Sequence, residues 1–190
     1  SAKEYLNLES EAIIEYEITA NRVDAASHIG VARDVYAYMA LNKIPCELKY
    51  PDVSAFKEGA GKGIPVEVLD HEGSPRYAGI TIRGVKVEPS PEWLQKKLTS
   101  IGLHPINNIV DISNFILFEL GQPLHRFDAS KIIGGKVIVR RAAEGELIRT
   151  LDGVERKLSG GDMVIANEKA PMCIAGVFGG GMLALDAAHE

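Results

Sequence analysis

The sequence predicts an α+β protein with a single domain, in which helices pack on a mostly antiparallel β core. Two segments, residues 27–41 and 108–120, carry apolar residues at helical spacing. From residue 134 onward, short apolar runs alternate with glycine-containing turns, which is typical of antiparallel strands. Strands and helices do not alternate regularly enough for a doubly wound sheet. The glycine motifs lack both the phosphate-loop lysine and the setting of a dinucleotide-binding motif.

The first part of the chain predicts a strand, a polar connection and a helix. Residues 12–18 alternate in polarity like a strand, and residues 27–41 have the spacing of an amphipathic helix. Between them, the polar residues 19–24 can cap the helix that follows. We interpret residues 21–24 as a segment that fixes the strand-to-helix turn through hydrogen bonds, and we assign no catalysis to it.

The middle of the chain predicts a long connection, two strands and a second helix. Residues 49–63 show little periodicity and indicate a surface connection. Residues 64–70 and 76–87 alternate like strands. The helix that follows is expected to have Ser90 as its N-cap and Pro91 at its first helical position.

This second helix is expected to end before Gly102 and to present an apolar stripe. We interpret Trp93 as a core residue of the stripe and not as a platform for stacking nucleic-acid bases, because aromatic rings at helical spacing are usually core. The stripe consists of Trp93, Leu94, Leu98 and Ile101.

Residues 101–128 place more chemically useful polar residues among apolar ones than any other stretch. A helix is predicted over residues 108–120, and Gly121 should end it in the left-handed conformation. Gln122-Pro123 then forces an extended turn, so that His125 follows a rigid corner, as a functional site requires. The apolar face of this helix comprises Ile109, Ile112, Ile116 and Leu120, and the polar residues that interrupt it are Asp111, Ser113, Asn114 and Glu119.

The last part of the chain predicts four strands separated by glycine turns. The strongest turn signal is Asp152-Gly153 between Leu151 and Val154, which indicates a β-hairpin. The predicted strands are residues 136–141, 147–151, 163–166 and 172–178, and the other turns are Gly134-Gly135 and Gly160-Gly161.

Length and composition indicate an ordinary globular domain over residues 1–190, with 46% hydrophobic and 25% charged residues. No signal-peptide pattern opens the chain, and the weakly polar residues 171–185 are too few for a membrane helix of about 20 residues. We therefore expect a cytoplasmic protein without membrane contact. Cys46 and Cys173 lie far apart and lack the spacing of a disulfide framework or a zinc site.

The net charge of −5 argues against a free-standing nucleic-acid binder, because lysine and arginine supply most non-specific affinity for phosphate. It still permits a module to which RNA is delivered by other parts of a larger enzyme. Three basic pairs can contact a phosphate backbone, although solvated surface charge is the favoured interpretation of each. They are Lys96-Lys97, Arg140-Arg141 and Arg156-Lys157.

Three ordered segments carry a resemblance to a known family. The sequence VDISNF at residues 110–115 is followed by ELGQPLHRFD at residues 119–128. Residues 19–33 and 140–180 fit the same family in the same order. Over roughly residues 15–180, the chain resembles the editing, or tRNA-binding, domain of the bacterial phenylalanyl-tRNA synthetase beta subunit.

This resemblance implies hydrolytic editing, in which tyrosine mischarged onto phenylalanine tRNA is removed by cleavage of its ester. The alternative is a non-catalytic tRNA-docking or structural interaction module of the synthetase. The implied partners are phenylalanine tRNA and the alpha subunit of a hetero-oligomer. No cofactor or metal is expected in this fragment, whereas ATP and magnesium belong to the intact synthetase.

The resemblance also implies which residues form the site. His125 matches the functional histidine of the family and is expected to orient water or the terminal ribose, with Asn114 as the second catalytic residue. The backbone N–H groups around Gly179 and Gly180 can approach the ester carbonyl, with a tight β turn as an equally open alternative. The expected substrate-binding residues are His104, Ser113, Pro123, Gly179 and Gly180.

Two departures from the family pattern bear on activity. His104 stands where relatives usually carry arginine, which weakens any bidentate contact to a phosphate or carboxylate. After the glycine pair, relatives place a glutamate that recognises the tyrosine hydroxyl, whereas this chain has Gly181, and residues 181–190 do not resemble the family. We therefore expect a weak or inactive editor unless Asp186 or Glu190 supplies the charge.

Overall fold

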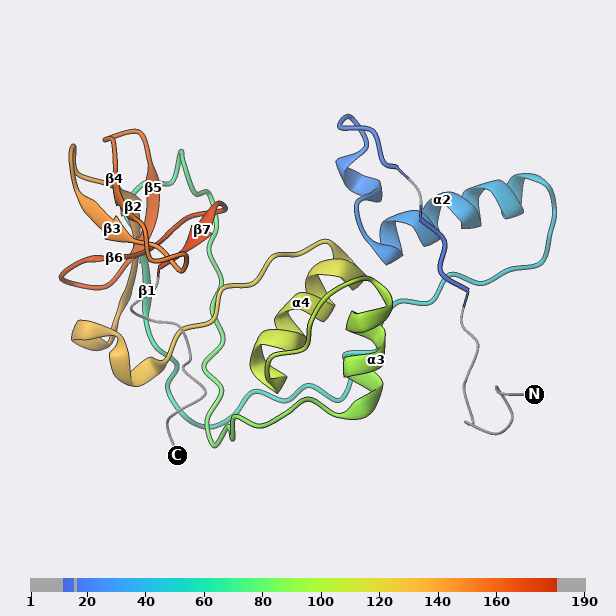
Figure 1. The fold of residues 1–190 in the computed structure, drawn as a ribbon, viewed down its shortest axis with the longest axis horizontal. Helices are drawn as coiled ribbons and strands as arrows, with labels where there is room; N and C mark the ends of the chain where they lie inside the picture. The colour runs from blue at the N-terminus through green and yellow to red at the C-terminus, as the bar shows by residue number, and fades with distance from the viewer. Residues whose placement is uncertain (1–11, 16, 181–190) are drawn as a thin grey trace. The chain divides into compact units, whose positions relative to one another are not determined.

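The computed structural model describes residues 12–15 and 17–180. By its internal contacts the chain divides into two compact units. Unit 1 comprises Ser1–Pro51 and Pro89–Gln122, and unit 2 comprises Asp52–Glu88 and Pro123–Glu190. The longer helices lie in unit 1 and the strands in unit 2 (Figure 1). The α+β class is confirmed, while the single domain over residues 1–190 and the packing of helices on the sheet stay predictions.

Among the described residues, unit 1 contains three α-helices, and local capping explains two of their starts. The Ser27 hydroxyl accepts a hydrogen bond from the Gly30 N–H at 3.0 Å, and the Asn107 side chain accepts from the N–H groups of Ile109 and Val110. Gly121 ends the last helix at φ +77°, as predicted. The helices are α2 (His28–Leu41), α3 (Glu92–Ser100) and α4 (Asn108–Leu120), and a short 3-10 turn, η1 (Val23–Ala25), precedes α2.

Three expectations for unit 1 are wrong. Residues 12–15 and 17–18 form no strand, because a strand needs a partner and the described part of unit 1 contains none. Ser90 does not cap α3: Pro91 is the N-cap residue, and the Ser90 hydroxyl donates to Asp111 instead. Trp93 is 57% exposed and touches Phe115 edge to face, with ring centroids 5.7 Å apart, so the core of α3 consists of other residues, Leu94 and Leu98.

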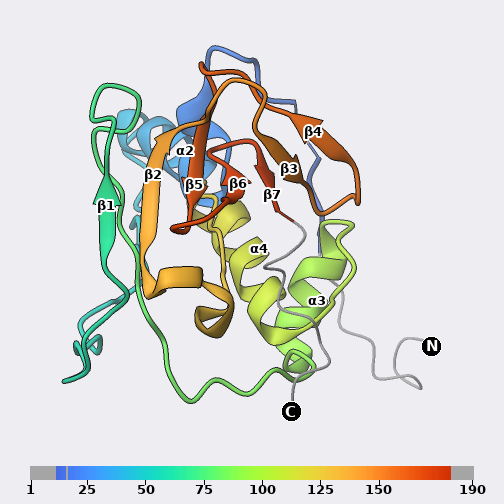
Figure 2. The same cartoon turned by 90° about the vertical axis from the view of Figure 1, so that its left-hand side faces the viewer.

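The described part of unit 2 contains a five-stranded sheet and a two-stranded one. Their strands are labelled in Figure 2. Only β1 and β2 pair in parallel, and every other described pair of strands is antiparallel, which confirms the mostly antiparallel core. The larger sheet has the order β1 (Val66–Val68), β2 (Val137–Arg141), β5 (Met163–Ala166), β6 (Pro171–Ile174) and β7 (Phe178–Gly179). The smaller sheet pairs β3 (Leu147–Arg149) with β4 (Glu155–Lys157).

Both faces of the central strand β5 are buried, and each contributes to its own core. Ile165 packs into a cluster with residues of β2 and β6, whereas its neighbour Val164 points to the opposite face. The first cluster comprises Ile132, Val137, Val139, Ile165, Met172 and Cys173, and the second comprises Ala142, Ile148, Leu158, Val164 and Ala166. Burial on two faces explains why β5 reads as a continuous apolar run.

The predicted hairpin is confirmed, and two strand predictions are wrong. Gly153 has φ +78° in the turn between β3 and β4. Residues 76–87 form no strand: the Thr81 hydroxyl, in place of a backbone carbonyl, accepts the Ile64 N–H at 2.9 Å. The single strand expected over residues 172–178 is instead β6, a turn through Gly176 at φ +71°, and β7.

Candidate functional site

The seven predicted site residues divide between the two units. His104, Ser113 and Asn114 belong to unit 1, in the loop before α4 and in its second turn. Pro123, His125, Gly179 and Gly180 belong to unit 2. The boundary falls between Gln122 and Pro123, within the stretch of residues 101–128 that is rich in polar residues. The roles of these residues therefore stay predictions.

In unit 1, the loop that carries His104 is attached to α4 by a buried carboxylate. Asp111 is fully buried, and its Oδ1 accepts the Ile106 N–H at 2.9 Å while its Oδ2 accepts the Ser90 hydroxyl at 2.5 Å. Asn107, next along the loop, caps α4. His104 itself is exposed. In the sequence, Asp111 is visible only as a polar residue that interrupts an apolar face, and the pattern does not predict that it anchors the loop.

Ser113 and Asn114 lie on α4 just after this anchor. The Ser113 hydroxyl is buried and donates to the carbonyl of Val110, one turn earlier, at 2.7 Å. Asn114 is half-buried, so its amide keeps part of its surface accessible. Of these two predicted pocket residues, Asn114 is the one whose side chain can reach a ligand without first exchanging a buried hydrogen bond.

In unit 2, His125 is held in a short segment with two fixed neighbours. Its ring lies nearly parallel to that of Phe127, at a centroid distance of 6.3 Å and an interplanar angle of 20°. Phe127 packs against the first core cluster, and the Asp128 side chain accepts the Ser130 N–H at 2.9 Å at the start of η2 (Ala129–Lys131). These contacts restrain the backbone on the C-terminal side of His125.

The His125 environment favours the neutral imidazole. Although the side chain as a whole is exposed, surrounding atoms partly desolvate the ring, and the positive charge of Arg126 adds to the effect. Both causes lower the pKa of His125 below its ordinary value of 6.5. A neutral imidazole can accept a hydrogen bond from water at one ring nitrogen, which is the chemistry needed to orient a nucleophile.

Gly179 and Gly180 lie in extended backbone, so the tight-turn alternative is wrong. Gly179 pairs with Cys173 across β6 and β7, and its carbonyl accepts the Leu151 N–H at 3.0 Å. Gly180 forms a bridge with Thr150. A Cβ at Gly180 would lie 2.0 Å from the Met172 carbonyl oxygen, so this glycine permits a close approach of two backbone segments.

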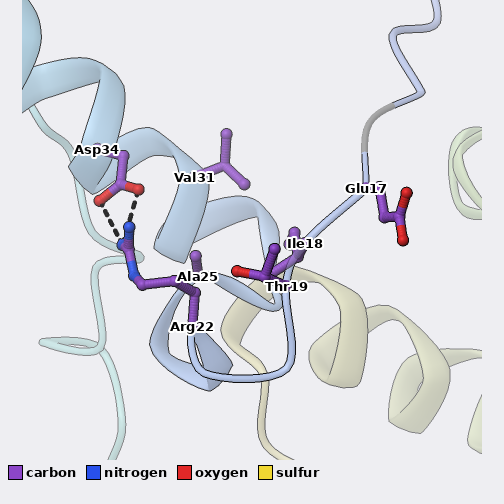
Figure 3. Close-up of a pocket in the computed structure, with 7 residues that line it drawn as sticks. All are labelled: Glu17, Ile18, Thr19, Arg22, Ala25, Val31 and Asp34. Atoms are coloured by element: carbon purple, nitrogen blue, oxygen red, sulfur yellow. Dashed lines mark hydrogen bonds and ion pairs between the residues drawn. The ribbon is translucent and has the colours of Figure 1, made fainter.

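Two hollows in unit 1 involve none of the predicted site residues. The smaller has a volume of about 260 Å³ and is lined by Arg22, Asp34 and parts of the preceding segment (Figure 3). Arg22 donates to Asp24 at 3.0 Å and to both carboxylate oxygens of Asp34, which ties η1 to α2. This supports the structural interpretation of residues 21–24, through pairing of side chains. The larger hollow, about 610 Å³, includes His28, Phe115 and Phe118.

The predicted basic pairs are largely engaged by carboxylates. Each contact joins a lysine or arginine nitrogen to a carboxylate oxygen at 3.0 Å or less, which favours structural surface charge over phosphate binding. The pairs are Lys96–Glu92, Arg140–Glu146, Arg141–Asp70 and Arg156–Asp152. Within the described ranges, no group of three or more histidine, cysteine, aspartate or glutamate side chains is placed to hold a metal ion.

Comparison with known proteins identifies the family. The phenylalanine–tRNA ligase beta subunit of Bacteroides fragilis is 56% identical over 180 residues, which cover 94% of this chain and 22% of that protein. The beta subunits from Porphyromonas gingivalis and Fusobacterium nucleatum are 52% and 45% identical over the same shares of both chains. The chain thus spans about a fifth of the length of these relatives.

None of the helices in the described part of the chain has the length and apolar character to cross a membrane. The B3/4 domain family matches residues 73–188, which is more than half of the sequence and includes all seven predicted site residues and both residues of the Asp111–Ser90 contact. The chain therefore belongs to the B3/4 domain family.

Proposed function

We propose that this chain is the editing part of a phenylalanine–tRNA ligase beta subunit and hydrolyses the ester of tyrosine mischarged onto phenylalanine tRNA. The observation that carries the proposal is His125, a histidine with a lowered pKa between a proline corner and a core-anchored phenylalanine. The assignment to this ligase is supported by relatives up to 56% identical, which are named phenylalanine–tRNA ligase beta subunits.

Ester hydrolysis needs a placed water, a group that orients or deprotonates it, and donors for the developing oxyanion. We propose that neutral His125, in unit 2, orients the water or the terminal ribose, and that Asn114, in unit 1, is the second catalytic residue. The proposed substrate-binding residues are His104, Ser113, Pro123, Gly179 and Gly180.

Specificity explains why such an activity accompanies a ligase for phenylalanine. A synthetic pocket shaped for phenylalanine cannot strongly reject an isostere that only adds a hydroxyl, so tyrosine is attached at an appreciable rate. A second site that prefers the hydroxyl removes the error. In this proposal, phenylalanine tRNA and an alpha subunit are the partners, and ATP and magnesium serve the ligation reaction elsewhere in the assembly.

The decisive experiment measures deacylation of tyrosyl-tRNA and phenylalanyl-tRNA by the chain and by His125→Ala. We expect His125→Ala to lower tyrosyl-tRNA deacylation by roughly ten- to a thousandfold, the scale for one placed hydrogen-bonding or proton-transfer group. His71→Ala is the matched control, because His71 is an exposed histidine of the same unit. Unchanged hydrolysis by folded His125→Ala contradicts the role of His125.

One observation favours a second candidate, a non-catalytic interaction module. The Ser113 hydroxyl is buried and donates to the Val110 carbonyl within α4. If the unmodified chain hydrolyses tyrosyl-tRNA no faster than buffer does, while still binding a full-length partner assembly, this second function replaces the first.

A further inference from the structure

The buried face of α4 contains a carboxylate that the proposed hydrolysis does not use. Asp111 has no exposed surface, and the hydrogen bonds to its two oxygens come from uncharged groups, the Ile106 N–H and the Ser90 hydroxyl. A carboxylate in such a place requires donors to both oxygens, because its hydration is lost. Figure 1 shows α3 and α4 side by side in unit 1, and Asp111 connects the segments that lead into both helices.

The two partners of Asp111 are themselves held in place. The Gln95 amide of α3 donates to the Ser90 carbonyl at 2.6 Å, so Ser90 is fixed from both sides. Asn107, which follows Ile106 directly, is buried and caps α4. Two consecutive residues of the loop are therefore hydrogen-bonded to the first turn of α4, one through Asp111 and one through the cap.

These bonds act on the part of unit 1 where predicted site residues lie. His104 is separated from Ile106 only by Pro105, whose ring restricts the backbone between them. On the helix side, Ser113 and Asn114 follow Asp111 within one turn. A shift of the loop relative to α4 would therefore change the distance between His104 and Asn114.

We propose that Asp111 is a positioning residue, which holds the loop of residues 103–106, and with it His104, in one position relative to Asn114 on α4. The inference rests on the proposed function for its effect on catalysis. Its physical basis is that a buried carboxylate with two oriented donors fixes both segments, whereas an apolar side chain would fill the same space without directional bonds. A displacement of about 1 Å in a site of this kind can cost a hundredfold in rate.

The test compares two substitutions of Asp111 that differ in hydrogen bonding. Asp111→Asn can keep both contacts, because its Oδ1 can accept the Ile106 N–H while its Nδ2 donates to the Ser90 oxygen. Asp111→Leu keeps similar volume and loses both. We expect Asp111→Leu to lower the maximal rate of tyrosyl-tRNA deacylation by about ten- to a hundredfold with a smaller change in KM, and Asp111→Asn to recover most of the loss.

A double-mutant comparison separates positioning from simple stability. If Asp111 acts through the His104 loop, adding Asp111→Leu to His104→Ala should lower the rate less than it does in the unmodified chain. All rates are measured where the emission of Trp93, the single tryptophan, shows that unit 1 is folded. Additive losses, or full activity of folded Asp111→Leu, overturn the proposal.

A second readout does not depend on activity. Amide hydrogen exchange at Ile106 should be slow in the unmodified chain, faster in Asp111→Leu and slow again in Asp111→Asn. If the unmodified chain hydrolyses no tyrosyl-tRNA, the proposed function fails and exchange alone decides whether Asp111 anchors the loop. Equal exchange at Ile106 in all three proteins overturns the inference. Should Asp111→Leu fail to fold, Ser90→Ala, which removes one of the two bonds, takes its place in both measurements.

Discussion

Replacing Gly180 by alanine tests whether this predicted site residue is first of all a structural one. An alanine Cβ there would lie 2.0 Å from the Met172 carbonyl oxygen and 2.9 Å from the carbonyl carbon. Both atoms belong to the backbone of β6, and Met172 is buried in the first core cluster. Neither atom can move aside by a change of rotamer, so β6 and the segment of Gly180 must separate.

The expected loss of stability follows from this contact. Adding a methyl group to a packed core costs about 1–3 kcal/mol, and the involvement of backbone places Gly180→Ala near 3 kcal/mol. At Gly179, the new Cβ would meet Leu151 Cδ1 at 2.8 Å, but Leu151 is exposed and its side chain can rotate away. Gly179→Ala should therefore cost about 0.5–1.5 kcal/mol, the scale of one strained rotamer.

Thermal unfolding followed by circular dichroism, with amide exchange in β5 and β6, measures the difference. For a domain of about 100 residues, 3 kcal/mol corresponds to a decrease of roughly 12–24 °C in Tm. Gly59→Ala is the matched control, since a Cβ at Gly59 meets no atom within 4 Å in the same unit. The emission of Trp93 follows unit 1 independently.

The reasoning is refuted if Gly180→Ala unfolds at the same temperature as Gly59→Ala, or if Gly179→Ala is destabilised as much as Gly180→Ala. Gly179→Ala also has a functional outcome. If the backbone of the glycine pair contacts the ester, this variant should lose deacylation while it retains most of its stability.

Three further predictions concern titration, thiol reactivity and selectivity. Burial and Arg126 lower the pKa of His125 below 6.5, so the folded chain binds fewer protons at this residue than the unfolded chain does. The contribution of neutral His125 to stability is therefore complete above pH 6.5 and is lost as the pH falls through the folded pKa. Proton NMR of the ring measures the titration midpoint in the folded chain, and a midpoint at or above 6.5 contradicts the prediction. Burial raises the pKa of Cys173 to about 12, whereas Cys46 is exposed. A thiol reagent at neutral pH should therefore label Cys46 alone in the folded chain and both cysteines after denaturation. Rapid labelling of both cysteines in the folded protein refutes this prediction. Gly181, which lies outside the described residues, provides no carboxylate to accept a hydrogen bond from a tyrosine hydroxyl. Gly181→Glu should therefore raise the rate of tyrosyl-tRNA deacylation but not that of phenylalanyl-tRNA deacylation. An equal rise for both esters would show that the carboxylate acts on the water and not on the tyrosine hydroxyl.

Features governed by neighbouring residues were predictable from the sequence. The Asp152-Gly153 turn needs a residue with positive φ, and Gly153 supplies it at +78°. Gly121 likewise ends α4, where its N–H donates to the Leu117 carbonyl at 2.8 Å. In both cases the chemistry that decides the conformation lies within a few residues along the chain, so a local pattern contains it.

The strand predictions failed where a distant partner decides the outcome. Residues 12–18 and 76–87 have the alternation of strands, but alternation specifies only which side chains share a face. Near residues 76–87, the Ile64 N–H is bonded to the Thr81 side chain, which no pairing rule for backbone strands anticipates. The division of the chain at Gln122 and Pro123 was missed for a similar reason, because contacts far apart in sequence define the two units.

The buried face of α4 shows why periodicity alone misplaced its functional residues. Ile112 and Leu120, assigned to the apolar face, are 46% and 40% exposed, whereas Asp111 is fully buried. A hydropathy pattern assigns aspartate to the surface because an unpartnered buried charge is costly, and it contains no information about donors elsewhere in the chain. Here Ser90 donates one bond from the segment before α3, whose N-cap residue is Pro91. The burial of Asp111 therefore depends on two hydrogen bonds, one from the nearby Ile106 N–H and one from Ser90, which is distant in sequence.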